Sequence, residues 1–121
     1  MPENEKTVFV VDDEPLTAGT LAIILNRSGF KARGFDDPQK ALAACSAHPP
    51  DLLITDVLMP GMTGIELATH VKSFLPQCAV FLLSGRAEAT DLLEEARQRG
   101  QDFDLILKPV HPADLLTKIR A

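Results

Sequence analysis

Short apolar runs alternate along the chain with longer stretches in which apolar residues recur at helical spacing. The runs predict five β-strands, at Thr7–Val11, Lys31–Phe35, Asp51–Thr55, Ala79–Leu83 and Phe103–Leu107. The other stretches predict five α-helices, at about Pro15–Ser28, Pro38–Ala47, Ile65–Phe74, Thr90–Arg99 and Pro112–Ile119. Such alternation is typical of βα units that build a parallel sheet.

Local signals support these elements. Pro15 opens the first helix and Gly29 lies just past its end, while Asp37 and Pro38 have the character of a cap and a first helical residue. The third strand is apolar enough to be buried on both faces. Right-handed crossovers then send helices to both faces of the sheet, so we expect an α/β, doubly wound, five-stranded fold.

Composition fits a single domain. The chain has 121 residues, of which 45% are hydrophobic, and its net charge of −5 argues against direct nucleic-acid binding by this domain. No apolar run approaches the length that spans a bilayer, so no membrane segment is expected. The polar start, Met1 to about Lys6, is unlike a secretory signal and is expected to be a flexible lead. Cys45 and Cys78 are interpreted as reduced thiols.

Polar side chains stand where four of the predicted strands end. They are Asp12, Asp13, Asp56, Ser84 and Lys108. In doubly wound sheets the functional site lies beyond the carboxyl ends of the strands, at a switch in strand order. We therefore expect these five side chains to meet at one edge of the sheet.

Clustered carboxylates favour a hard divalent cation, because they would otherwise repel one another. We expect Asp13 and Asp56 to bind Mg²⁺ directly, Asp12 to bind it through water, and the backbone carbonyl of Leu58 to complete the site. One Asp56 oxygen would remain free to attack phosphorus and form an acyl phosphate. The Ser84 hydroxyl and the Lys108 ammonium would then hold the phosphoryl oxygens.

Each group also has a simpler interpretation when taken alone. Asp12 and Asp13 with the following Glu14 suit the start of the first helix, because acidic residues favour helix N-termini. Ser84 with Gly85 suits an ordinary turn, and Lys108 suits a solvated loop. Only Asp56 favours a functional role by itself, and it is the joint occurrence that makes coincidence improbable.

Four segments together resemble the receiver domain of two-component response regulators. They are Val10–Glu14, Asp51–Gly64, Leu82–Gly85 and Leu107–Pro109, and the likeness extends from about Lys6 to Ile119. The resemblance implies a flavodoxin-like (βα)5 fold with strand order 2-1-3-4-5. It assigns Asp56 as phosphoacceptor, Asp12 and Asp13 as the acidic metal pair, Ser84 as switch hydroxyl and Lys108 as phosphoryl contact. It also implies a cis Lys108–Pro109 peptide, and Mn²⁺ as a substitute for Mg²⁺.

The resemblance further implies a cytoplasmic signalling switch that modifies itself and is not a turnover enzyme. A histidine kinase, a phosphotransfer protein or a small phosphodonor such as acetyl phosphate would supply the phosphoryl group. Phosphorylation would shift the surface of the fourth helix, fifth strand and fifth helix towards a second packing, controlling an output domain or a downstream protein. Pairing into a homodimer through the same surface is a further expectation.

Two positions that tune the family's switch are unusual here. The aromatic residue expected three positions before Lys108 is replaced by Leu105, and Phe103 lies two residues earlier on the same side of the strand. We expect signalling to rely on the Ser84 loop and the fourth helix rather than on an aromatic rotamer. The residues that flank the attacking water in receivers are Leu58 and Arg86 here, which favours a long-lived phosphoryl state.

Two other functional classes remain open on the sequence alone. A small magnesium-dependent phosphohydrolase could use an aspartyl nucleophile, although the adjacent first-strand aspartates and the absence of room for a cap domain disfavour it. A receiver-like binding module that is never phosphorylated is the second alternative, disfavoured because the full acidic set and the lysine are present. Incubation with a phosphodonor separates the three classes.

Overall fold

Five parallel strands form a single sheet in the order β2-β1-β3-β4-β5. The computed structural model describes residues 6–85, 88–101 and 103–120, so most of the lead expected at the N-terminus lies outside the described residues. The strands are β1 (Thr7–Val11), β2 (Lys31–Phe35), β3 (Leu52–Asp56), β4 (Ala79–Ser84) and β5 (Asp104–Leu107). The helices are α1 (Pro15–Arg27), α2 (Pro38–Ala47), α3 (Gly64–Phe74), α4 (Glu88–Gln98) and α5 (Pro112–Arg120). The predicted fold class and strand order are confirmed.

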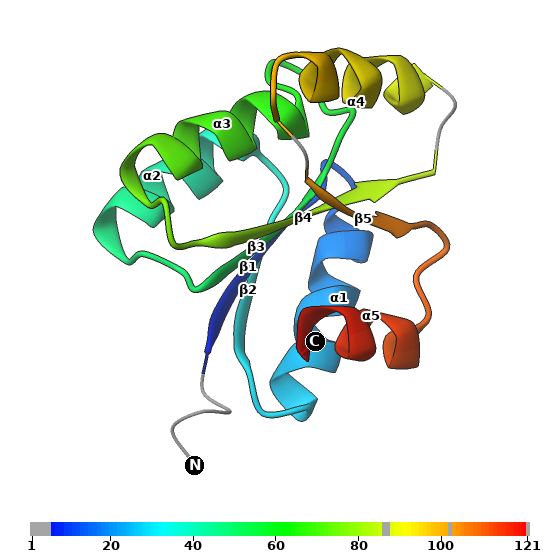
Figure 1. Ribbon diagram of the computed structural model, residues 1–121. Coiled ribbons are helices and arrows are strands. Elements are labelled where there is room, and N and C mark those ends of the chain that lie inside the picture. The colour runs from blue at the N-terminus through cyan, green and yellow to red at the C-terminus, as the bar shows by residue number, and fades with distance from the viewer. Residues whose placement is uncertain (1–5, 86–87, 102, 121) are drawn as a thin grey trace.

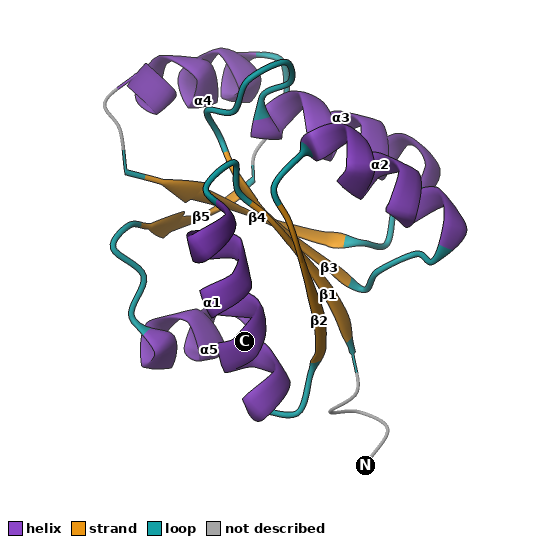
Figure 2. Cartoon of the chain, turned by 180° about the vertical axis from the view of Figure 1, so that it is seen from behind, coloured by secondary structure: helices purple, strands orange, loops and turns teal. Residues whose placement is uncertain are grey.

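Helices cover both faces of the sheet. α2, α3 and α4 lie on one face, and α1 and α5 lie on the other, as the opposite views in Figures 1 and 2 show. Two buried clusters match these layers, one contributed by α2, α3 and α4 and the other by α1 and α5. The sheet is therefore enclosed as its apolar central strands require.

Strand β1 supplies side chains to both layers. Phe9 and Val11 belong to the cluster under α2 and α3, whereas Val8 and Val10 belong to the cluster under α1 and α5. Successive side chains of a strand point to opposite faces, so a continuous apolar run is buried on both sides. This burial fixes the register of β1 and hence the place where it ends, just before Asp12.

Helix α3 starts with a capping box that sequence reasoning did not identify. Thr63 Oγ1 accepts a hydrogen bond from the Glu66 backbone N–H at 3.1 Å, and Glu66 Oε1 accepts one from the Thr63 N–H at 2.9 Å. The Thr-x-x-Glu spacing ahead of an apolar helix is the sequence signature of this motif. At α2 the predicted cap is confirmed, because the Asp37 side chain accepts from Gln39 N–H.

Several predicted boundaries are corrected. Asp56 and Ser84 are the last residues of β3 and β4 and do not follow them, because the ladder continues through Asp56 opposite Leu83 and Ser84 opposite Leu107. Helix α4 begins at Glu88, ahead of the expected start, since Glu and Ala favour helices more than Thr does. Phe74 ends α3 as expected but is 43% exposed, whereas Leu67 and Val71 earlier in the helix are buried.

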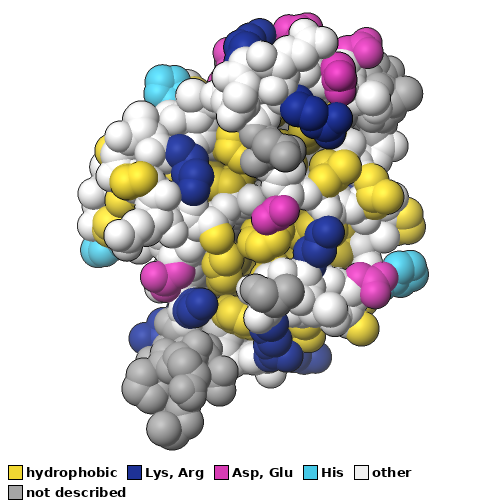
Figure 3. Space-filling model, in the orientation of Figure 1, with side chains coloured by type: hydrophobic (Ala, Val, Ile, Leu, Met, Phe, Trp, Pro, Cys, Tyr) yellow, Lys and Arg dark blue, Asp and Glu magenta, His cyan; other side chains and the backbone are white. Residues whose placement is uncertain are grey.

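Strand β5 is an edge of the sheet and is only partly covered. Leu107 is 68% exposed although it lies in a strand. Figure 3 shows hydrophobic side chains gathered in the middle of the face where Figure 1 places β5. Along the described residues, no helix has the length and apolar character needed to cross a bilayer.

Both cysteines are buried, and burial raises the pKa of each thiol to about 11. The unfolded thiols ionise near the ordinary value of 9.0, so above it the unfolded chain releases protons that the folded chain retains. We therefore expect the free energy of unfolding to fall as the pH rises from about 9 to about 11. Urea unfolding at about pH 8 and about pH 10 measures this slope. In the Cys45→Ala/Cys78→Ala protein the slope should be smaller, and an unchanged slope would refute the assignment to the thiols.

Candidate functional site

The carboxyl ends of β1, β3, β4 and β5 bring the predicted polar residues to one edge of the sheet. β1 is adjacent to β3, β3 to β4 and β4 to β5. The last paired residues are Val11 with Thr55, Asp56 with Leu83 and Ser84 with Leu107. Because the four strands are parallel, their ends face the same side of the molecule.

Asp12 is a fully buried carboxylate that accepts two hydrogen bonds. Its Oδ1 accepts a hydrogen bond from the Glu14 backbone N–H at 3.0 Å, and its Oδ2 accepts one from Lys108 Nζ at 2.8 Å. A buried charge requires such partners, since its desolvation is otherwise costly. Glu14, the residue before α1, makes no side-chain capping bond. Helix capping also does not explain why Asp12 pairs with Lys108 from the far end of the chain.

Asp56 ends β3 and is 8% exposed. Its Oδ1 accepts from the Val57 backbone N–H at 2.9 Å, and its Oδ2 lies 3.5 Å from Lys108 Nζ. Lys108 thus bridges the carboxylates of β1 and β3 from the end of β5. The ammonium stands in a direct ion pair with Asp12 and a longer one with Asp56.

Only glycine fits at position 64, because the backbone of Asp56 lies too close for a side chain there. A Cβ added at Gly64 would lie 2.0 Å from the Asp56 carbonyl oxygen, which is backbone and cannot rotate away. The Gly64 N–H also donates to the Val57 carbonyl at 2.8 Å. The first residue of α3 is therefore in close backbone contact with the end of β3 and the residue after it. The sequence did not predict this contact, because no side chain takes part in it.

Burial and the facing charges shift the pKa values of Asp56 and Lys108. Burial raises the pKa of Asp56; Lys108 lowers it and the negative charge of Asp12 raises it, leaving a net rise. Burial alone would lower the pKa of Lys108, but its hydrogen bond to Asp12 and the charges of both carboxylates outweigh this and raise it. The ammonium is thus held as the positive partner of two acids.

The three carboxylates lie close enough together to share one divalent cation. One oxygen from each of Asp12, Asp13 and Asp56 lies within 4.8 Å of the other two. Asp13 Oδ1 is buried and has no hydrogen-bond partner among the described residues. A buried carboxylate oxygen without a donor is expensive unless a cation takes its charge. Oxygen ligands of this kind suit Mg²⁺, so the residues fit the expected metal.

Ser84 and Lys108 come together at the end of the β4–β5 pair. Ser84 is buried, and its carbonyl accepts a hydrogen bond from the Lys108 backbone N–H at 2.9 Å. The Lys108–Pro109 peptide bond is cis. A Cβ added at Gly85 would lie 3.0 Å from the Cβ of Lys108. The lysine stem therefore passes close to the residue after the strand.

The remaining expected residues belong to the loop after β3, the loop after β4 and the start of β5. Leu58 is half-buried against the cluster under α3. Phe103 and Leu105 both pack against that same cluster, so they share a side of the sheet as expected. Arg86 lies outside the described residues.

The chain is similar to known proteins over nearly its whole length. The family model described as "Response regulator receiver domain" matches residues 8–120. The chain is 29% identical over 123 residues to "DNA-binding response regulator MtrA" of Mycolicibacterium smegmatis, covering 100% of this chain and 52% of that protein. It is 28% identical over 118 residues to "Phosphate regulon transcriptional regulatory protein PhoB" of Pseudomonas aeruginosa, covering 96% and 51%. The chain therefore spans about half the length of these relatives.

Solved structures show the same fold. A response regulator receiver domain protein of Clostridium thermocellum superposes with a TM-score of 0.83 and 26% identity, over 95% of this chain and 91% of that one. The chemotaxis protein CheY4 of Vibrio cholerae superposes with a TM-score of 0.82 and 25% identity, over 96% and 97%.

Proposed function

Because the chain belongs to the family of response regulator receiver domains of two-component systems, we propose that it is a signalling switch phosphorylated on Asp56. The observation that carries the proposal is the meeting of Asp12, Asp13, Asp56 and Lys108, which come from three distant parts of the chain. Neither helix capping nor an exposed loop accounts for a lysine shared between two buried carboxylates. Phosphoryl transfer commonly uses acidic residues that can hold a metal ion, together with a positively charged side chain that contacts the phosphoryl group.

Each residue of the site has its own role in the proposed reaction. Asp56 Oδ1 is held by the Val57 N–H, so the carboxylate is oriented before any donor binds. One Asp56 oxygen attacks phosphorus, and Lys108 and the Ser84 hydroxyl hold the phosphoryl oxygens. Mg²⁺ or Mn²⁺, held by Asp13, Asp56 and the Leu58 carbonyl, with Asp12 acting through water, would offset the negative charge of the phosphoryl group.

Signal output would follow from the added charge. Phosphorylation adds about −1.5 to −2 units of charge beside Ser84, which favours an inward position of this hydroxyl and its loop. The surface of α4, β5 and α5 is the proposed output face, and the exposed Leu107 and the charged Asp114 and Lys118 lie there. Its partner would be an output domain, a downstream protein or a second copy, and the phosphoryl source a histidine kinase or phosphotransfer protein in the cytoplasm.

Intact mass after incubation with acetyl phosphate and Mg²⁺ tests the proposal. We expect one phosphoryl adduct per chain, lost when the divalent ion is removed by a chelator. Turnover of phosphate esters without an accumulating adduct would instead indicate a phosphohydrolase. The lack of an adduct with every donor would indicate a binding module that is not phosphorylated.

Leu58 is expected to prolong the phosphorylated state. Its side chain has no group that can orient water, and it lies two residues beyond Asp56. In Leu58→Ala the smaller side chain admits water to the phosphoryl group, so we expect the adduct to decay about threefold to tenfold faster, equivalent to about 0.7 to 1.4 kcal/mol in the barrier. The decay is followed by intact mass after the donor is removed. Phe74→Ala, a change at the far end of α3, should leave the rate unchanged, and equal decay in all three proteins would contradict this role.

A further inference from the structure

Thr55 is a buried polar residue to which the proposed chemistry gives no role. Its side chain is fully buried, one position before Asp56 on β3. The other buried polar or charged residues in the described part of the chain all belong to the site, and they are Asp12, Asp56 and Ser84. A hydroxyl in a packed interior is costly unless it is hydrogen-bonded, so its partners indicate what it does there.

The Thr55 hydroxyl faces the backbone at the end of β3. Thr55 Oγ1 donates a hydrogen bond to the Asp56 carbonyl oxygen at 3.0 Å, and it lies 4.0 Å from Met59 Sδ. Met59 is itself buried. One side chain therefore contacts the chain on both sides of Leu58, the residue whose backbone carbonyl is the proposed metal ligand.

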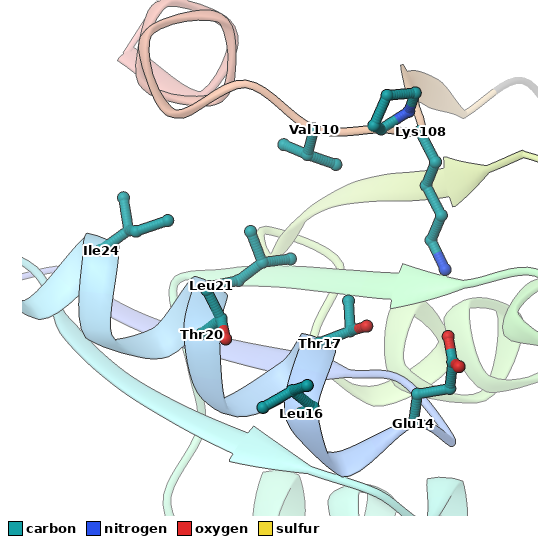
Figure 4. A pocket seen from close by; sticks show the side chains of 9 residues that line it. Glu14, Leu16, Thr17, Thr20, Leu21, Ile24, Lys108 and Val110 are labelled. Atoms are coloured by element: carbon teal, nitrogen blue, oxygen red, sulfur yellow. The ribbon is translucent and has the colours of Figure 1, made fainter.

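Thr55 and Lys108 reach this region from different layers of the fold. Leu53, two residues before Thr55 on the strand, belongs to the cluster under α2 and α3, so the Thr55 side chain points to the same layer. Lys108 instead lines a groove with residues of α1, and Figure 4 shows it extending from the β5 side towards Glu14 at the start of that helix. The lysine pairs with acid side chains, whereas the threonine contacts backbone and the Met59 side chain.

The position of the Leu58 carbonyl depends on the residues that flank it. Val57 is fixed at both ends, because its N–H donates to the Leu83 carbonyl at 3.2 Å and its carbonyl accepts from the Gly64 N–H at 2.8 Å. The Leu58 carbonyl belongs to the planar peptide group that joins Leu58 to Met59. A side chain that fixes Met59 therefore also fixes the direction of this carbonyl.

We propose that Thr55 is a positioning residue that orients the Leu58 carbonyl towards the divalent cation. The inference rests on the metal site of the proposed function and deepens it. In this role Thr55 contacts neither the cation nor the phosphoryl group, and it acts through the backbone of Asp56 and through Met59. Loss of a group that orients a metal ligand commonly lowers metal affinity by about tenfold to a hundredfold.

Thr55→Val tests this role, because valine has nearly the shape of threonine and lacks the hydroxyl. We expect its affinity for Mn²⁺ to be about tenfold lower than that of the wild type, measured by electron paramagnetic resonance of the free ion during titration with Mn²⁺ alone. Thr55→Ser keeps the hydroxyl and should keep the wild-type affinity. Thr117→Val is the matched control, because the Thr117 hydroxyl also donates to a backbone carbonyl, that of Ala113 on α5 at 2.9 Å, and its affinity should be unchanged.

Urea unfolding of the same proteins separates positioning from a merely structural role. Valine loses the hydrogen bond and serine leaves space where the methyl group was packed, so both changes of Thr55 should lower the free energy of unfolding. The affinity for Mn²⁺ should fall in Thr55→Val alone. An equal fall in both folded variants would follow from lost packing and would overturn the positioning role.

The remaining outcomes are also decisive. Wild-type affinity in folded Thr55→Val overturns the role of Thr55, and normal labelling of that protein by acetyl phosphate with Mg²⁺ leaves the function of Asp56 intact. Reduced affinity in folded Thr55→Ser contradicts the role whatever the valine variant does. A wild-type protein that binds no Mn²⁺ refutes the metal site and the role of Thr55 together. Normal Mn²⁺ binding without labelling refutes the phosphoacceptor function of Asp56 alone.

Discussion

Asp56→Asn is expected to abolish the phosphoryl adduct while the protein stays folded. The amide cannot act as the attacking carboxylate, but its carbonyl oxygen can still accept the hydrogen bond that Val57 N–H donates at 2.9 Å. We therefore expect the free energy of unfolding to remain within about 1 kcal/mol of the wild type. Intact mass after treatment with acetyl phosphate and Mg²⁺ measures the first effect, and urea unfolding measures the second.

Asp36→Asn is the matched control for this change. Asp36 follows β2 at the same edge of the sheet, but its side chain is exposed. Labelling of Asp36→Asn should equal that of the wild type. An adduct that persists in Asp56→Asn at the wild-type level would show that another residue accepts the phosphoryl group.

Gly64→Ala is expected to be strongly destabilising and to impair phosphorylation. The new methyl would lie 2.0 Å from the Asp56 carbonyl oxygen, so α3 and the segment after β3 must separate. Overpacking of this kind costs about 3 kcal/mol or more when backbone has to move. A displacement of Asp56 by about 1 Å would also lower the phosphorylation rate by as much as about a hundredfold. Urea unfolding and the initial rate of labelling report the two effects.

Gly19→Ala provides the comparison for this substitution. Gly19 lies inside α1, and an added Cβ there meets no atom within 4 Å. Alanine favours a helix over glycine by about 0.5 to 1 kcal/mol, so this variant should be more stable than the wild type. If Gly64→Ala unfolded at the wild-type urea concentration, the close approach of α3 to Asp56 would not constrain the fold as described.

Much of the fold was predictable because burial leaves a clear pattern in this chain. The continuous apolar run of β3 marks a strand covered on both sides, and all five of its residues are buried. The exposure of Leu107 was not predictable, because an apolar residue at the end of an edge strand does not reveal whether a neighbouring helix covers it. The ends of β3 and β4 were placed one residue early, since polar Asp56 and Ser84 were assumed to end the pairing.

The sequence predicted which residues form the site better than it predicted which of them are in contact. Parallel strands place their carboxyl ends together, which is why Asp12, Asp56 and Lys108 could be expected at one edge. The sequence carries no sign of which acid the lysine contacts more closely, and the distances of 2.8 and 3.5 Å depend on side-chain packing. The role of Gly64 was not predicted for a similar reason, because the sequence does not show which glycine lies too close to another backbone segment to carry a side chain.

The ion pair between Lys108 and Asp12 has a consequence for the order in which the newly made chain can fold. The two residues are 96 positions apart. While the ribosome is still translating the middle of the chain, Asp12 has no lysine with which to be buried, and desolvating it alone is unfavourable. We therefore expect Asp12 to become buried only after nearly the whole domain has emerged from the exit tunnel, and a nascent chain stalled before Lys108 to remain incompletely packed around this carboxylate.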